Sequence, residues 1–128
     1  MLAPIALLAL AATAPDQGEV RYVTDGDTFR LTSGERIRIA GIDAPETHAD
    51  QSKCRAEIVQ GKAAATRLRT MIEGRTVRLV RVGRSYNRTV ARVTVDGRDL
   101  AGQLVSRGAA RWWPRGKPKP DWCPAGRR

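Results

Sequence analysis

Two short acidic segments are the first candidates for chemistry in this sequence. They are residues 25–28, Asp-Gly-Asp-Thr, and residues 43–46, Asp-Ala-Pro-Glu. In regular strands Asp27 would face the same side as the apolar residues after it, and Asp43 the same side as those before it. Two carboxylates that meet on an apolar face repel each other, so one binds a proton or a cation lies between them. Oxygen ligands favour a hard divalent ion, although either segment alone is also ordinary turn sequence.

Arginine and glutamate side chains add the groups that phosphoryl chemistry needs. Arg38 precedes Asp43 on the same predicted strand, and Arg88 begins a later one. A guanidinium donates two parallel hydrogen bonds to a phosphate and stays charged during a reaction. Glu46 could accept a proton from an attacking water or orient it. With a metal ion, these groups would stabilise the charge that builds in phosphodiester hydrolysis, although any single Arg of so basic a chain can simply be solvated.

The overall charge points to a polyanionic partner. The chain contains 23 Lys and Arg against 13 Asp and Glu, a net charge of +10. Such a surface attracts nucleic acid first and an anionic membrane surface second. The single histidine, His48, is not accompanied by a thiolate or imidazole cluster that would suggest zinc, so we interpret it as a solvated loop residue.

The N-terminal segment and the cysteines indicate export. Residues 1–14 carry no charged side chain, and their apolar run is shorter than the roughly 20 residues that span a bilayer. This pattern is typical of a secretory signal, so we expect a periplasmic or secreted protein; an ordinary tail or a misassigned start are the alternatives. In an exported chain the pair Cys54 and Cys123 is expected to form a disulfide rather than two free thiols.

The apolar periodicity predicts one domain built from strands and helices, since 128 residues suffice for a single core. The expected elements are strands 19–24, 27–32 and 36–42, helix 56–73, strands 76–82 and 89–95, and a short helix 100–107 capped by Asp99. A helix between the third and fourth of five strands, in the order β-β-β-α-β-β-α, is the arrangement of an OB barrel, a mixed α+β fold. The domain is expected over residues 19–113, followed by an extended tail, residues 114–128.

These segments together resemble the staphylococcal nuclease (thermonuclease-like) family. The matching pieces are residues 25–28, residues 38–46 and the tripeptide Tyr-Asn-Arg at 86–88. Their order and spacing agree with the family, and the similarity extends over residues 20–113. The resemblance implies an OB barrel with helices, and a nuclease that cleaves DNA and RNA with calcium and leaves 3′-phosphates.

The resemblance also implies a role for each matching residue. Asp27 and Asp43 would be calcium ligands, and Ala44 would offer its backbone carbonyl. Arg38 and Arg88 would bind the scissile phosphate. Glu46 matches the residue proposed as the family's general base.

The sequence departs from the family pattern at three places. The loop at residues 83–87 reads Gly-Arg-Ser-Tyr-Asn, where an acidic residue and a glycine are common in the family. Trp112 and Trp113 stand near the place of tyrosines that stack close to the substrate, and could form a base platform or simply pack. The long C-terminal helix of some members is missing, and the tail with Cys123 could substitute for its packing.

Two other functions compete with a nuclease. A non-catalytic OB module would hold nucleic acid through its basic surface, but it has no use for acidic residues that repel phosphates. A peripheral membrane protein would need a basic amphipathic helix with large apolar anchors, which we do not find. We therefore expect a nuclease without stable membrane insertion, as a monomer.

Overall fold

The computed structural model describes residues 16–124, and the predicted signal segment, residues 1–14, lies outside this range. The elements in chain order are β1 (Gln17–Asp25), β2 (Thr28–Leu31), β3 (Arg36–Ile39), β4 (Ile42–Asp43), α1 (Arg55–Ile72), β5 (Thr76–Ser85), β6 (Arg88–Val95), β7 (Arg98–Asp99), α2 (Leu100–Ser106) and β8 (Arg111–Trp112). Within residues 16–124, no helix is long and apolar enough to cross a membrane.

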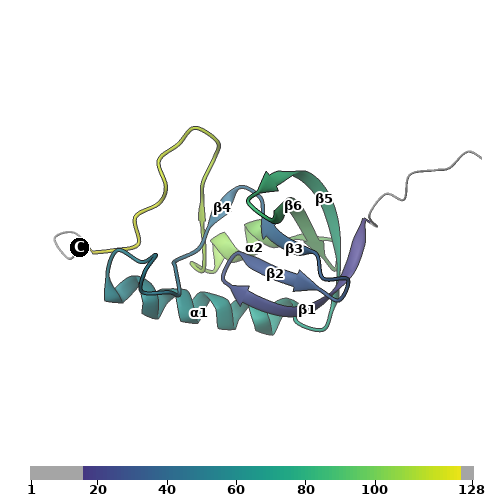
Figure 1. Ribbon diagram of the computed structural model, residues 1–128, viewed down its shortest axis with the longest axis horizontal. Helices are drawn as coiled ribbons and strands as arrows, with labels where there is room; N and C mark the ends of the chain where they lie inside the picture. Colours follow the sequence, from purple (N-terminus) through teal and green to yellow (C-terminus); the bar gives the residue numbers. More distant parts are fainter. Residues whose placement is uncertain (1–15, 125–128) are drawn as a thin grey trace, which may run out of the picture.

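Five of the strands close into a ring. The sheet order is β3-β2-β1-β5-β6, with β7 beside β6, and an additional pairing joins β3 to β6. That closing pair is parallel, with Ile37 opposite Thr89 and Ile39 opposite Ala91. The ring, with α1 along one side of it in Figure 1, confirms the predicted mixed α+β fold and OB barrel.

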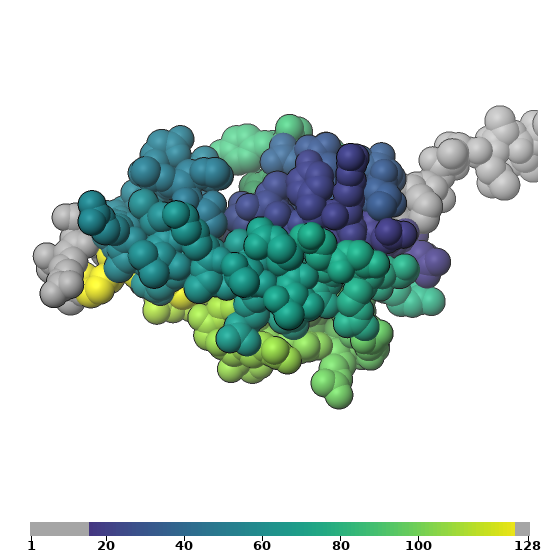
Figure 2. Space-filling model, turned by 90° about the horizontal axis from the view of Figure 1, so that it is seen from below, coloured from purple at the N-terminus to yellow at the C-terminus, as the bar shows by residue number. Residues whose placement is uncertain are grey.

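Alternating apolar side chains fill the barrel, as the period of the strands requires. Val20, Phe29, Ile37 and Ile39 are all fully enclosed. The buried stripe of α1 joins the same core, because its apolar residues recur at helical spacing. The buried members of this stripe are Ala64, Ala65, Leu68 and Ile72. The core therefore fills the barrel and extends to α1, whose outer face forms part of the surface in Figure 2.

The structure corrects two predicted strand boundaries. The first hairpin turns at residues 26–27, because Asp25 pairs with Thr28, so Asp27 lies in the turn and not at the start of a strand. The predicted strand 36–42 is interrupted at Gly41, whose φ of 80° suits glycine and breaks a regular strand. Its last part becomes β4, which pairs with β8 instead of continuing the barrel.

Of two further predictions, the loop at residues 83–87 differs from the structure and the cap of the second helix is confirmed. The loop expected at residues 83–87 is mostly strand, since β5 runs to Ser85 and leaves Tyr86 at the turn with a φ of 57°. The cap of the second helix is as expected, because the Asp99 carboxylate accepts a hydrogen bond from the Gly102 amide at 3.1 Å.

The chain after β8 leaves the barrel and returns to the beginning of α1, as Figure 1 shows in yellow. A disulfide joins Cys54, immediately before α1, to Cys123 in this tail, which confirms the predicted bridge. Pairing of Ile42 with Trp112 and of Asp43 with Arg111 attaches the other end of the tail to β4. The tail is therefore fixed at both ends, beside the segment that carries Asp43.

Candidate active site

A surface cavity of about 970 Å³ brings most of the candidate residues together. It lies where the β1–β2 turn, the segment after β4 and the β5–β6 hairpin meet. Of the predicted site residues, those with side chains in its wall are Asp27, Arg38, Asp43, Glu46 and Arg88. Ala44 is not in the wall, but it is buried next to it and its amide contacts Asp27.

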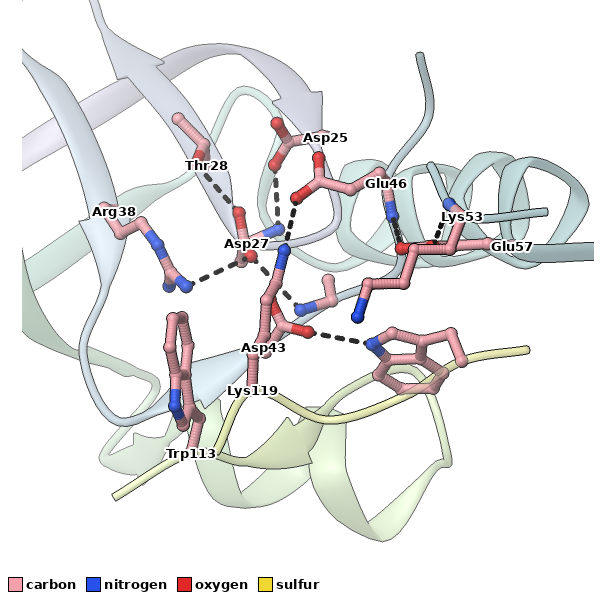
Figure 3. A network of polar contacts seen from close by, with 12 residues as sticks. Asp25, Asp27, Thr28, Arg38, Asp43, Glu46, Lys53, Glu57, Trp113 and Lys119 are labelled. Carbon is pink, nitrogen blue, oxygen red and sulfur yellow. Dashed lines mark hydrogen bonds and ion pairs between the residues drawn. The ribbon is translucent and has the colours of Figure 1, made fainter. Parts of the chain in front are cut away.

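Asp27 is held from several sides although it lies in a turn. One oxygen, Oδ1, accepts from the Thr28 hydroxyl at 2.9 Å, and Oδ2 accepts from the Ala44 amide at 3.1 Å. The Arg38 guanidinium lies 3.5 Å from Oδ2, an ion pair drawn in Figure 3. Burial by itself would raise the pKa of Asp27, but Arg38 and these hydrogen bonds hold it below its usual value. Asp27 is therefore a fixed, ionised oxygen donor.

Asp25, for which no role was predicted, lies beside Asp27. Its Oδ1 accepts from the Asp27 amide at 3.2 Å. Burial and the repulsion of Asp27 raise the pKa of Asp25 to about 8. A cation between these carboxylates would relieve that repulsion, so the donor set fits a hard divalent ion.

Asp43 is the most deeply buried carboxylate of the cavity, at 1% exposure. The Trp122 indole donates to its Oδ2 at 2.8 Å, and the Lys119 ammonium lies 3.9 Å from its Oδ1. Burial raises the pKa of Asp43 in spite of both contacts. Neither Trp122 nor Lys119 was expected at the site, since both belong to the tail that was predicted only as extended chain.

Glu46 is placed by the beginning of α1. Its amide donates to Glu57 Oε2 at 3.0 Å, and the Lys53 amide donates to Oε1 of the same carboxylate at 2.9 Å. The segment also lies directly on Gly61, where a Cβ atom would come within 2.4 Å of the Glu46 carbonyl oxygen. The buried Glu57 and the absent side chain of Gly61 thus determine where the backbone of Glu46 runs, and neither was recognised from the sequence.

Lys119 reaches across the cavity to Glu46. Its ammonium lies 3.1 Å from Glu46 Oε1, and Figure 3 shows it between Glu46 and Asp43. Burial would lower the pKa of Lys119, but the contacts with Glu46 and Asp43 raise it. The tail therefore supplies a positive charge to the acidic side of the cavity.

Arg88 lies on another wall, at the beginning of β6. Its guanidinium donates to the Thr28 hydroxyl at 3.2 Å and to the Ser85 hydroxyl at 3.2 Å. Thr28 also donates to Asp27, so one hydroxyl connects the basic and acidic sides. Arg38 donates through its other terminal nitrogen to the Ile39 carbonyl at 2.7 Å. Both guanidiniums are held near the carboxylates and face a cavity large enough for a phosphate.

The aromatic residues divide between the cavity and the surface. Trp113 lines the cavity, and its indole donates to the Lys117 carbonyl at 2.8 Å. Trp112 is half exposed on β8 and is not part of the wall. Of the two tryptophans considered as base platforms, Trp113 is thus the one in position. His48 is exposed at the cavity, in keeping with a solvated loop residue.

The carboxylates do not form a complete metal cage by themselves. Among residues 16–124, no group of three or more His, Cys, Asp or Glu side chains is arranged to hold an ion. A hard divalent ion commonly takes backbone carbonyl and water oxygens as well. Asp27, Asp43 and the carbonyl of Ala44 would therefore need water or substrate oxygens to complete the coordination.

Comparison with known proteins found one family. The family model of the staphylococcal nuclease homologues matches residues 36–121. The matched range contains Arg38, Asp43, Glu46 and Arg88 and extends into the tail as far as Asp121, whereas Asp27 precedes it. No curated protein matched the chain.

Proposed function

The chain belongs to the staphylococcal nuclease homologue family, and on that premise we propose that it is a calcium-dependent nuclease that hydrolyses phosphodiester bonds of DNA or RNA. The observation that carries the proposal is the convergence of Asp27, Asp43, Arg38 and Arg88 on one cavity. Paired buried carboxylates are costly unless they hold a cation or a proton. Paired guanidiniums beside them match an anion that is held on the same cation.

In this proposal charge stabilisation, phosphate orientation and proton transfer are carried out by different groups of the cavity. A bound calcium ion would supply electrostatic stabilisation of the charge on the phosphate oxygens. Arg38 and Arg88 donate hydrogen bonds to the same oxygens and orient the phosphate for attack. Glu46 accepts a proton from the attacking water, whose oxygen bonds to phosphorus. The bond from phosphorus to the 5′ oxygen breaks, this oxygen takes a proton from water, and Glu46 returns its proton to solvent, so the products are a 3′-phosphate and a 5′-hydroxyl.

The proposed substrate is a flexible nucleic-acid strand. Trp113 gives the cavity wall one aromatic face, on which any base can stack, and the net charge of +10 attracts the phosphate backbone. Neither feature selects one base or one sugar, so we propose activity on both DNA and RNA.

The decisive experiment is cleavage with and without calcium. Plasmid DNA and a single-stranded RNA are incubated with the protein in calcium, in EGTA, and in EGTA followed by excess calcium. We expect cleavage only where calcium is free, with 3′-phosphate ends that a phosphatase removes. Equal cleavage in EGTA would contradict the metal assignment. Tight binding of both substrates without any cleavage would favour the alternative, a non-catalytic OB module.

We also propose that the protein works as a monomer in the periplasm or outside the cell. The Cys54–Cys123 disulfide supports an oxidising compartment, because such bonds rarely persist in the cytosol. Fractionation of producing cells, with N-terminal sequencing of the exported chain, tests the location. Recovery of the full-length chain from the cytosol alone would contradict it.

A further inference from the structure

Trp122 is a buried tryptophan whose indole contacts Asp43 of the candidate site. Its residue is 6% exposed, and its Nε1 donates to Asp43 Oδ2 at 2.8 Å. A buried indole N–H needs an acceptor, and here the acceptor is a carboxylate that the proposed function makes a calcium ligand. The other oxygen, Oδ1, is the one nearer to Lys119, whose side chain lines the cavity. The indole thus occupies one carboxylate oxygen and leaves the other for the cavity.

The surroundings of Trp122 hold its ring in place. The Arg111 guanidinium stacks over the ring at 4.2 Å from its centroid, and Arg111 is the residue that pairs with Asp43 between β4 and β8. The backbone of the same residue is held as well, because the Gln60 amide of α1 donates to the Trp122 carbonyl at 3.0 Å. Asp43, Arg111 and Trp122 therefore form a closed set in which each contacts the other two.

The disulfide is next to this set in the chain. Cys123 directly follows Trp122 and is bonded to Cys54, which precedes α1. The tail between β8 and Cys123 has no helix or strand of its own. Without the bridge, little besides side-chain contacts would hold Trp122 against Asp43, and a chain end with few backbone contacts is readily displaced.

We propose that Trp122 is a positioning residue that orients Asp43 for calcium, and that the Cys54–Cys123 disulfide keeps it in place, so that the calcium affinity of the site depends on the bridge. This rests on the proposed calcium site. Partners that hydrogen-bond a metal-ligating carboxylate restrict its rotation, and losing one typically weakens metal binding by about 10- to 100-fold.

The first test is calcium binding measured by titration calorimetry, which needs no catalysis. Trp122→Phe keeps an aromatic ring in the pocket and removes the N–H donor. The matched control is Trp112→Phe, because Trp112 is half exposed and outside the cavity. We expect the dissociation constant for calcium to rise about tenfold or more in Trp122→Phe and to stay within twofold of the parent in Trp112→Phe. Equal affinity in all three proteins would overturn the proposal.

The second test uses the unaltered protein, so it does not depend on a variant that folds. The indole ¹⁵N–¹H signal of Trp122 is followed by NMR while calcium is added. We expect this signal to shift as the site fills, because the charge on its acceptor is then shared with the ion, and the Trp112 signal to remain in place. An unmoved Trp122 signal at saturating calcium would overturn the proposal.

The third test addresses the disulfide through a double-mutant cycle. The Cys54→Ser, Cys123→Ser double variant should also bind calcium about tenfold more weakly, and adding Trp122→Phe to it should cost little more, because both changes remove the same contact. Thermal unfolding gives the midpoint of each variant, and all titrations are run at a temperature below the lowest midpoint. If calcium affinity is unchanged without the bridge, or if the losses from the two changes are fully additive, the proposed role of the disulfide is wrong.

The outcome also separates this inference from the proposed function. Calcium binding by the parent with no effect of Trp122→Phe defeats the inference alone. No calcium binding by the parent at all defeats both, and cleavage assays in EGTA then show whether a metal-independent nuclease remains.

Discussion

The ammonium of Lys119 lies 3.1 Å from Glu46 Oε1 and 3.9 Å from Asp43 Oδ1, so a residue of the tail contacts two carboxylates of the candidate site at once. Lys119 brings to this cavity the same sign of charge as a metal ion. A calcium ion bound at Asp43 would repel the Lys119 ammonium. The ammonium would then either move away or stay in place and weaken calcium binding.

We therefore predict that Lys119→Met tightens calcium binding. The ion pairs are partly solvated and worth up to about 1 kcal/mol, which corresponds to a gain of roughly twofold to fivefold in affinity. Lys117→Met, in the exposed tail, is the matched control for the loss of one positive charge. Calorimetric titration with calcium measures both, and weaker binding in Lys119→Met would show that the ammonium supports the site.

Glu46→Gln should slow cleavage while leaving nucleic-acid binding nearly unchanged. The amide keeps the size of the side chain but cannot accept the proton of the attacking water, a loss expected to cost about a hundredfold or more. The exposed Glu19 on β1 provides the control Glu19→Gln. Single-turnover cleavage in calcium is measured beside equilibrium binding. Parent-like cleavage by Glu46→Gln would remove Glu46 from the mechanism.

The variants Arg88→Ala and Arg92→Ala should distinguish a loss of cleavage rate from a loss of electrostatic attraction for nucleic acid. Both residues lie on β6, but Arg88 is half-buried at the cavity and Arg92 is exposed. Loss of a donor that stabilises charge in the transition state should cost Arg88→Ala about a hundredfold or more in single-turnover rate. Arg92→Ala should instead weaken binding slightly, in a way that vanishes as salt is raised. Similar cleavage rates in the two variants would contradict the role of Arg88.

Glu35→Gln should destabilise the barrel in a pH-dependent way. The Arg81 guanidinium donates to both Glu35 oxygens at 2.6 and 2.8 Å, and the Thr89 hydroxyl donates at 2.9 Å. The hydrogen bond from Arg81 is the main cause that lowers the pKa of Glu35 below its usual 4.5.

Because the folded pKa is the lower one, this stabilisation is present above about pH 4.5 and is lost as pH falls through the folded value. At pH 7 we expect Glu35→Gln to lower the free energy of unfolding by about 1–2 kcal/mol, measured as a lower urea midpoint. The difference from the parent should shrink below pH 4.5, whereas a constant difference from pH 7 to pH 3 would point to a purely steric effect.

The sequence by itself was sufficient for the barrel and for most of the cavity wall. Strand alternation predicted one apolar face for the residues after Asp27 and before Asp43, because a side-chain period of two is a local property of the backbone. Phe29, Ile37 and Ile39 on that face are fully buried. Asp27 and Arg38 were predictable neighbours because the β2 and β3 strands beside them pair in one meander, whereas Asp43 reaches the cavity on β4, which pairs with β8. The cysteine pair was also predictable, because only one intramolecular pairing exists for two cysteines.

Only the tertiary structure decided how the candidate site is completed. The contact between Trp122 and Asp43 joins residues 79 positions apart, and that between Lys119 and Glu46 joins residues 73 positions apart. No periodicity records such contacts, because they arise only when β8 pairs with β4 and the disulfide turns the tail back toward α1. The roles of Glu57 and Gly61 could not be predicted from the sequence for a related reason. On a helix they count as one polar and one small residue, and their effect on Glu46 exists only because the segment between β4 and α1 packs on that helix.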